Sequence, residues 1–293
     1  MSKDHLSSTT REFLDTIGSD PGNEKRIRHI QEDKWINYGT AVNVSKKVDR
    51  IKKAPLKLRP QCLLIKGDPQ NGKSSMRDMI FRLYDLPGNL DKRPVIQCQM
   101  PADPNVNKFL NSLLVALGIG ERPTNKSDSL LRQLLRHLGE YQVELIMIDE
   151  FHHIGRCQDR VLRVLLDSIK DVTTMSQLPI LAFGVKSAGI IISKDSQIDS
   201  RFDQVELPLW TENQDYLRLL ASFESLLPLK KPSLLTTDEL AINILSRTNK
   251  TIGEISRLLE ALSIAAIESG EEKITLDMVK EIPFHSCKSI TFN

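Results

Sequence analysis

A glycine-rich segment near residue 70 has the residue types and the spacing that hold a chain of phosphates. Residues 67–74 read Gly-Asp-Pro-Gln-Asn-Gly-Lys-Ser and fit the pattern G-x-x-x-x-G-K-[ST]. The glycines allow successive backbone N–H groups to point at phosphate oxygens, and a following helix adds the positive end of its dipole. Lys73 is expected to reach the β- and γ-phosphates, and the Ser74 hydroxyl is expected to bind Mg²⁺.

The alternative to a phosphate loop is an ordinary glycine-containing turn, which the complete motif between a strand and a helix disfavours. The segment therefore predicts a nucleotide site made by Gly67, Asp68, Pro69, Gln70, Asn71, Gly72, Lys73, Ser74 and Ser75.

Two adjacent carboxylates end an apolar run later in the chain. Residues 145–148 read Leu-Ile-Met-Ile, and Asp149 and Glu150 follow directly. Asp149 is expected to hold Mg²⁺ or a water bound to it, and Glu150 to orient and deprotonate the attacking water. The alternative is a carboxylate pair that only caps the next turn. After a phosphate loop, the pair favours hydrolysis over phosphoryl transfer to a metabolite.

Two arginines follow at positions where they could act on a phosphate. Arg201, in Ser-Arg-Phe, comes shortly before the last expected strand and could reach the γ-phosphate of a neighbouring subunit as an arginine finger. Arg257 lies early in an expected helix and could reach the nucleotide of its own chain. Taken alone, the local sequence around each favours a solvated surface arginine.

These residues must be positioned by a fold, and the pattern of apolar and polar residues along the 293-residue chain indicates which fold it is. Hydrophobic residues make up 40% and charged residues 27%, which is typical of a soluble globular protein. Short apolar segments alternate with amphipathic ones, which predicts an α/β fold with a parallel, doubly wound sheet. Strands are expected at residues 62–65, 94–99, 143–148, 179–183 and 204–207, and helices at residues 73–84, 105–117, 127–138 and 159–172.

The pattern changes near residue 208, where the strands stop. Helices are expected at residues 212–226, 237–247, 252–268 and 276–281, and residues 23–53 also have a mostly helical pattern. We therefore expect an N-terminal arm and helical segment over residues 1–55, an α/β core over residues 56–208 and a small all-helical lid over residues 209–293.

Several kinds of protein and site are disfavoured by composition. No apolar run approaches the ~18 residues of a membrane helix, and the first thirty residues lack the apolar region of a secretory signal. The four cysteines are far apart and form no C-x-x-C pair, which fits structural thiols in a reducing cytoplasm. His152 and His153 adjoin the carboxylates, but the sequence places no third metal ligand, so a loop or interface role is expected.

Basic residues gather at residues 46–59, which hold seven Lys or Arg residues and a single Asp. Such a stretch could contact phosphates or an acidic partner, and a solvated helix face is an equally good interpretation.

The motifs, in this order, resemble those of AAA+ ATPases of the initiator-like branch and, more narrowly, of the TniB and TnsC group of target-selecting ATPases of bacterial transposons. The resemblance extends from about residue 33 to residue 282. It rests on residues 33–38 (Asp-Lys-Trp-Ile-Asn-Tyr), 67–74, 148–152, 200–202, 207–210 (Leu-Pro-Leu-Trp) and 253–259 (Gly-Glu-Ile-Ser-Arg-Leu-Leu).

The resemblance implies a P-loop AAA+ core followed by a lid, and a regulator of DNA transposition. ATP binding would drive head-to-tail assembly into a ring or helical filament around double-stranded DNA. The assembled protein would recruit a transposase and a target-selection partner, and ATP hydrolysis would disassemble it. Lys73 and Ser74 would bind phosphate and Mg²⁺, Asp149 and Glu150 would be the Mg²⁺ and water-activating pair, Arg201 the finger and Arg257 the lid sensor. A cytoplasmic protein associated with the nucleoid is expected, with no membrane contact.

One departure from the family pattern follows the expected strand at residues 179–183. Relatives usually place Thr or Asn where this chain has Val185, which cannot hydrogen-bond to a water. Either Ser187 substitutes or the water is held less well, in which case hydrolysis would be slow and switch-like.

The family contacts DNA through loops that follow the second strand and precede the Asp-Glu strand. The expected DNA-binding residues there are Lys108, Arg122, Thr124 and Lys126. They would contact backbone phosphates, so binding would be independent of sequence and strongly salt-dependent. The alternative for each of these residues is a solvated loop charge. The alternatives for the whole protein are a signalling or scaffold ATPase that does not bind DNA, a helicase loader and a small-molecule kinase.

Overall fold

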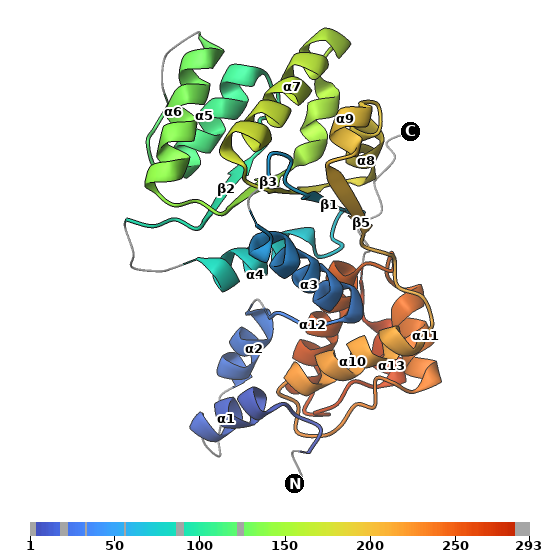
Figure 1. The fold of residues 1–293 in the computed structure, drawn as a ribbon. Coiled ribbons are helices and arrows are strands. Elements are labelled where there is room, and N and C mark those ends of the chain that lie inside the picture. Colours follow the sequence, from blue (N-terminus) through green and yellow to red (C-terminus); the bar gives the residue numbers. More distant parts are fainter. Residues whose placement is uncertain are drawn as a thin grey trace. The chain divides into compact units, whose positions relative to one another are not determined.

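The chain forms two compact units in the computed structural model, which describes residues 4–17, 23–32, 34–55, 57–85, 91–121 and 126–284 (Figure 1). The sheet unit comprises Thr40–Pro69 and Lys73–Pro208. The helical unit comprises Met1–Gly39, Gln70–Gly72 and Leu209–Asn293. The unit changes between residues 208 and 209, where the sequence pattern changes, whereas the N-terminal residues belong to the same unit as the C-terminal helices.

The sheet unit is built on five strands that are all parallel, as the sequence predicts, and their order is β2-β3-β4-β1-β5. They are β1 (Cys62–Lys66), β2 (Val95–Gln99), β3 (Leu145–Asp149), β4 (Ile180–Gly184) and β5 (Phe202–Glu206). β3 begins later than expected because the Val143 N–H donates to the Leu138 carbonyl at 3.0 Å and completes the preceding helix. β5 begins earlier than expected, since Phe202 pairs with Cys62.

Helices cover both faces of this sheet, which explains why its central strands β3, β4 and β1 are apolar runs rather than alternating ones. Figure 1 shows α5, α6 and α7 on one side and α3 and α4 on the other. The helices are α3 (Gly39–Lys53), α4 (Lys73–Tyr84), α5 (Val106–Ala116), α6 (Ser127–Glu140), α7 (Asp159–Ser176), α8 (Lys186–Ile192) and α9 (Ser196–Asp199), together with the 3₁₀ helix η1 (Phe151–Arg156). The sequence did not predict η1, α8 or α9, which are too short to show an apolar period.

The helical unit has its own core. It contains α1 (Ser8–Thr16), α2 (Asn23–Gln31), α10 (Gln214–Leu226), α11 (Asp238–Ser246), α12 (Ile252–Glu268) and α13 (Leu276–Glu281). The four C-terminal helices were all predicted, and Asn213, Thr251 and Thr275 cap three of them by accepting from backbone N–H groups. The helical pattern expected over residues 23–53 is divided between α2 and α3, and the described residues between them, 32 and 34–38, lie in no helix.

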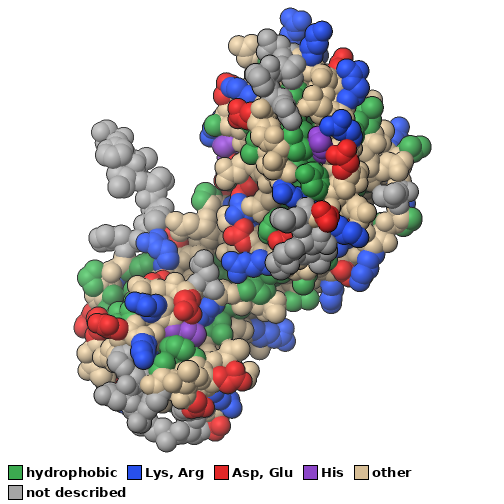
Figure 2. All heavy atoms as spheres, turned by 90° about the vertical axis from the view of Figure 1, so that its left-hand side faces the viewer, with side chains coloured by type: hydrophobic (Ala, Val, Ile, Leu, Met, Phe, Trp, Pro, Cys, Tyr) green, Lys and Arg blue, Asp and Glu red, His purple; other side chains and the backbone are tan. Residues whose placement is uncertain are grey.

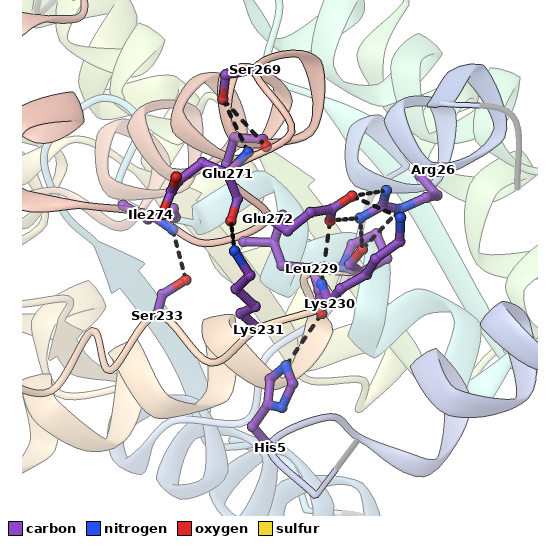
Figure 3. A network of polar contacts seen from close by, with 12 residues as sticks. His5, Arg26, Leu229, Lys230, Lys231, Ser233, Ser269, Glu271, Glu272 and Ile274 are labelled. Carbon is purple, nitrogen blue, oxygen red and sulfur yellow. Dashed lines mark hydrogen bonds and ion pairs between the residues drawn. The ribbon is translucent and has the colours of Figure 1, made fainter. Parts of the chain in front are cut away.

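A buried arginine ties α2 into this unit (Figure 3). Arg26 is fully buried, and its guanidinium donates to the Pro228 carbonyl through Nε at 3.0 Å and Nη2 at 2.6 Å. Nη1 and Nη2 donate to the two carboxylate oxygens of Glu272, and the Lys230 ammonium lies 3.0 Å from the same carboxylate. Burial acts to raise the pKa of Glu272, but the hydrogen bonds from Arg26 and Lys230 outweigh it and lower the pKa to about 2.

Candidate nucleotide site

The predicted phosphate loop and carboxylates meet at the carboxyl edge of the sheet. β4 lies between β1 and β3, and Lys66 and Ile148, near the ends of those strands, pair with Gly184 and Ala182. The Gly67 N–H continues this arrangement by donating to the Gly184 carbonyl at 3.2 Å. In open α/β sheets, ligands bind outside the carboxyl ends of the strands, so this edge is the expected place for a nucleotide.

Lys73 begins α4 and lies over the start of the loop. Its ammonium donates to the carbonyls of Gly67 at 2.9 Å and Asp68 at 2.6 Å. Burial lowers the pKa of Lys73, and the nearby carboxylates of Glu150 and Asp149 act in the opposite direction. Ser74 and Ser75 are exposed on the first turn of α4, with their hydroxyls available to a ligand at the helix N-terminus.

The middle of the loop, Gln70–Gly72, belongs to the helical unit and has a special backbone. Gly72 has a φ of 80° and Gln70 a φ of 59°, both in the left-handed region. The Gly253 N–H donates to the Gln70 carbonyl at 2.9 Å, and a Cβ on Gly253 would lie 2.6 Å from that oxygen. A side chain at residue 253 would therefore push this part of the loop away.

Asp149 ends β3 with both carboxylate oxygens engaged. Oδ1 accepts from the Glu150 N–H at 2.7 Å, and Oδ2 accepts from Nη1 of Arg77. Arg77 is on α4, one turn after Ser74, and also donates to Asp78 Oδ1 through Nε at 2.9 Å and Nη2 at 2.7 Å. Burial acts to lower the pKa of Arg77, but the two carboxylates outweigh it and raise the pKa. Sequence reasoning missed Arg77, whose only signal is its position three residues after Ser74.

Glu150 turns the chain from β3 into η1. Its backbone is left-handed with a φ of 52°, and its side chain is 44% exposed. Oε2 lies 3.3 Å from His152 Nδ1 and 4.0 Å from His153 Nε2. Burial lowers the pKa of His152, and the Glu150 carboxylate partly opposes this. The structure thus brings together three possible metal ligands, where the sequence indicated no third one.

Asp68 and the residues after β4 form a second polar group beside the loop. Lys186, at the start of α8, lies 3.0 Å from Asp68 Oδ2 and 3.2 Å from Glu206 Oε1. These hydrogen bonds raise the pKa of Lys186. Val185 precedes it, and Ser187 is exposed. Sequence reasoning considered Val185 and Ser187 here but missed the intervening lysine.

Arg201 lies at the opposite edge of the sheet from the loop. Its carbonyl accepts from the N–H of Cys62, the first residue of β1, whereas Gly67 follows the last residue of that strand. Five strand residues span about 16 Å. The Arg201 side chain donates through Nη1 to Lys170 O, Thr173 Oγ1 and Thr174 Oγ1 at 3.2, 2.8 and 2.9 Å, all on α7. Arg201 is therefore not brought together with Lys73 and Asp149 in one sheet unit.

Arg257 lies in the helical unit, on α12. Its guanidinium carbon is 5.8 Å from the centre of the Phe284 ring, in a cation–π arrangement.

The residues expected to contact DNA are only partly described. Lys108 on α5 pairs with Asp103 at 2.8 Å and is 51% exposed, and Lys126 immediately precedes α6. Arg122 and Thr124 lie outside the described residues. In the face drawn in Figure 2, Lys and Arg side chains stand among Asp and Glu side chains rather than in one continuous patch.

Part of the basic stretch at residues 46–59 is used inside the sheet unit. Lys52 pairs with Glu144 at 2.9 Å and lies over the Tyr84 ring, and Lys53 pairs with Asp49 at 2.6 Å.

Among the residues that the structure describes, no helix is both long and apolar enough to cross a membrane.

Solved structures with a similar fold include ORC and Cdc6 proteins. The ORC2 protein of Aeropyrum pernix, in its ADPNP–ADP complexes, matches with a TM-score of 0.58 and 14% identity over 87% of this chain and 71% of that chain. Cdc6p from Pyrobaculum aerophilum matches with a TM-score of 0.55 and 13% identity over 92% of this chain and 68% of that chain. Drosophila ORC bound to DNA matches with a TM-score of 0.57 and 10% identity over 90% of this chain and 65% of that chain.

Family comparison is more specific than the fold. No curated protein sequence matches the chain. The family described as bacterial TniB protein matches residues 26–212, which include the phosphate loop, Asp149, Glu150 and Arg201. The chain therefore belongs to the bacterial TniB protein family, and its fold is that of the AAA+ ATPases.

Proposed function

We propose that this chain is an ATP-dependent DNA-binding regulator of DNA transposition. It assembles on double-stranded DNA when ATP is bound, recruits a transposase and a target-selection partner, and comes apart when ATP is hydrolysed. Membership of the TniB family supports the link to transposition. Similarity in fold to Drosophila ORC bound to DNA supports DNA as the surface on which it assembles.

The carboxyl edge of the sheet would hold the nucleotide. Lys73 would exchange its two loop carbonyls for β- and γ-phosphate oxygens, and the loop N–H groups would bind the same phosphates. The Ser74 hydroxyl and the Asp149 carboxylate are oxygen donors of the kind that Mg²⁺ prefers. Bound Mg²⁺ would neutralise the charge that develops on the phosphates. Asp149 would exchange its contact with Arg77 for this role.

Glu150 would activate the attacking water. It directly follows Asp149, and its partly exposed carboxylate can accept a proton from a water at the same edge. Val185, next to this edge after β4, offers no hydrogen bond to that water. This supports slow, switch-like hydrolysis, because a poorly oriented water reacts less often.

The position of Arg201 carries the proposal that assembly completes the site. The arginine and its own phosphate loop lie at opposite ends of β1. Arg201 would therefore stabilise the γ-phosphate held by the next copy, so that ATP joins neighbouring chains head to tail. Arg257, in the helical unit, would contact the nucleotide of its own chain.

Contact with DNA would be made through phosphates. Lys108 would exchange Asp103 for a phosphate oxygen, and Arg122, Thr124 and Lys126 would act beside it. Because such contacts release counterions, we expect binding that is independent of sequence and weakens steeply with salt.

A mixing experiment tests the shared site. Arg201→Ala and Glu150→Gln are each expected to lower ATP turnover by at least about a hundredfold. A mixture of the two should recover part of the activity, because some neighbouring pairs combine an intact Arg201 with an intact Glu150. Arg163→Ala, an exposed arginine on α7, is the control and should leave turnover unchanged. If Arg201→Ala keeps both turnover and self-association, the shared site is wrong.

Binding to DNA is tested separately. Glu150→Gln with ATP should accumulate as oligomers on a DNA duplex, and retention should fall steeply between low and physiological salt. If the Glu150→Gln protein binds ATP but stays monomeric on DNA, the proposed ATP-dependent assembly is wrong. No retention on DNA at low salt with ATP would favour a scaffold ATPase that contacts only proteins.

A further inference from the structure

Glu150, His152 and His153 form a cluster that the proposed hydrolysis does not explain. One ligand atom from each lies within 4.8 Å of the others, and all three come from the turn that begins η1. Water activation needs the carboxylate alone, so two imidazoles beside it add a different chemistry. We propose that these three residues bind a divalent transition-metal ion such as Zn²⁺, which withdraws Glu150 from catalysis.

The tautomer of His153 is set by a backbone contact. Its Nδ1 is 3.0 Å from the Met100 carbonyl, which can only accept a hydrogen bond, so Nδ1 carries the proton. Nε2, which faces Glu150, is then left with its lone pair. The carbonyl itself is held in place, because the Met100 N–H donates to the Asp149 carbonyl at 2.8 Å and extends the β2–β3 ladder. Metal-binding histidines commonly have such a second hydrogen bond.

His152 offers a buried nitrogen with no other task. Among the described residues, its Nδ1 is the buried side-chain nitrogen or oxygen that has no hydrogen-bond partner, although Glu150 Oε2 is 3.3 Å away. An orphaned buried polar atom is costly, and a metal ion would satisfy it. The two imidazole rings lie 4.7 Å apart, edge to face.

The three ligand atoms lie within 4.8 Å of one another, so the cluster must contract to hold a tetrahedral ion. With metal–ligand distances of about 2.0–2.2 Å, neighbouring ligand atoms in a tetrahedron are about 3.4 Å apart. The 3.3 Å separation of His152 Nδ1 from Glu150 Oε2 already agrees, and the 4.0 Å separation of His153 Nε2 from that oxygen requires a small closure. The partly exposed Glu150 side chain provides this movement and an entry route.

The donor set selects the kind of metal. Imidazole nitrogens suit Zn²⁺, Co²⁺, Ni²⁺ and Cu²⁺, whereas Mg²⁺ prefers oxygen. Two histidines and a glutamate leave one coordination position for water. A metal ion on the Glu150 carboxylate makes that group a weaker base, because the positive charge of the ion disfavours protonation of either oxygen, while Lys73 and Ser74 remain able to bind ATP. Metal binding would thus hold the ATP-bound state.

Binding is tested first, without reference to ATPase activity. The full-length chain is titrated with Co²⁺ and followed by visible absorption, and with Zn²⁺ by calorimetry. His152→Ala and His153→Ala should each weaken the high-affinity site at least about tenfold, since even outer-shell changes around a metal cost that much. His137→Ala is the matched control: His137 also contacts a glutamate, Glu140, at 2.6 Å, but no second histidine was found with it among the described residues. Equal affinity in all four proteins overturns the site.

The proposed inhibition by metal rests on the proposed ATPase activity and is tested separately, by measuring ATP turnover. Zn²⁺ should slow the ATP turnover of the wild-type and His137→Ala proteins, and a chelator should restore it. For His152→Ala and His153→Ala, turnover with Zn²⁺ is compared with turnover of the same variant in chelator, and the ratio should stay near one. Metal binding without inhibition would overturn the regulation and leave the site. Absence of turnover in chelator would instead count against the proposed function.

Discussion

Two arginine–carboxylate pairs, one in each unit, show different solutions to burying a charge. Arg26 has no exposed surface, and its guanidinium is shared between both oxygens of Glu272 and the Pro228 carbonyl. Arg77 divides its guanidinium between Asp149, at the edge of the sheet, and the more exposed Asp78. Both members of the first pair contact only other residues of the protein. In the second pair, the Asp149 carboxylate is also proposed to bind Mg²⁺.

The difference separates a structural pair from an exchangeable one. Removing one partner of a buried pair leaves the other charge poorly compensated: Arg26 would lose its carboxylate, and Glu272 would keep only Lys230. With Mg²⁺ bound as proposed, Asp149 would have an alternative cation, and Arg77 would keep Asp78. The second pair can therefore break without unfolding the unit.

The largest effect is expected from Arg26→Met. The substitution leaves Glu272 with only Lys230 and the Pro228 carbonyl without its donors, so the free energy of unfolding should fall by about 3 kcal/mol. Urea denaturation of the full chain measures this. Arg28→Met, an exposed arginine on the same helix, should change it by less than about 0.5 kcal/mol. Equal effects of the two substitutions would show that the buried pair adds no stability beyond that of an exposed arginine.

Acid should weaken the first pair in a defined range. The pKa of Glu272 is 4.5 ordinarily and about 2 in the fold, so its contribution is complete above about pH 4.5 and is lost as the pH falls toward 2. Glu272→Gln cannot titrate, and the difference in stability between wild type and this variant should shrink over that range. Denaturation at several pH values checks this, and a constant difference would show that the pair is not ionised.

A smaller effect on stability, with a gain in Mg²⁺ binding, is expected from Arg77→Met. Asp149 keeps the Glu150 N–H, so the free energy of unfolding should fall by about 1–2 kcal/mol, less than for Arg26→Met. Without a competing cation, the Mg²⁺ concentration needed for half-maximal ATP binding should drop about fivefold, on the order of 1 kcal/mol. Arg82→Met, also on α4, is the control. A higher Mg²⁺ requirement would show that Arg77 assists the metal instead.

The smallest effect is expected from Asp78→Asn. Arg77 then keeps Asp149 as its carboxylate partner, and the Mg²⁺ requirement should rise by about twofold with almost unchanged stability. The same Mg²⁺ titration measures it. Opposite shifts for Arg77→Met and Asp78→Asn would establish competition between arginine and metal, and shifts in one direction would refute it.

Much of the fold was predictable because its signals are local. All five strands of the sheet were predicted, β1, β3 and β4 from clear apolar runs, and the helical pattern predicted α12 at Ile252–Glu268 and α4 at Lys73–Tyr84. The boundaries were wrong where a distant or neighbouring hydrogen bond decides them, as at Val143 and Phe202. Short helices such as α9 contain too few residues to show a period.

The site was predictable only where a motif encodes it. The phosphate loop and the Asp-Glu pair have fixed spacings, and the structure brings Lys73, Asp149 and Glu150 to one edge of the sheet. Arg26 and Arg77 look like ordinary helix-surface arginines in the sequence, because their burial depends on contacts far along the chain. The cluster of His152 and His153 with Glu150 could not be predicted, because it depends on the left-handed backbone turn at Glu150.

The bond between Arg26 and Glu272 joins positions 246 residues apart, and this bears on the order in which the protein folds during translation. The ribosome makes α2 before the sheet unit and makes Glu272 after it. The sheet unit, which is nearly continuous in the chain, can fold while the nascent polypeptide is still attached. The Arg26 side chain stays in water until Glu272 has been made, so the helical unit completes its folding after the sheet unit can do so.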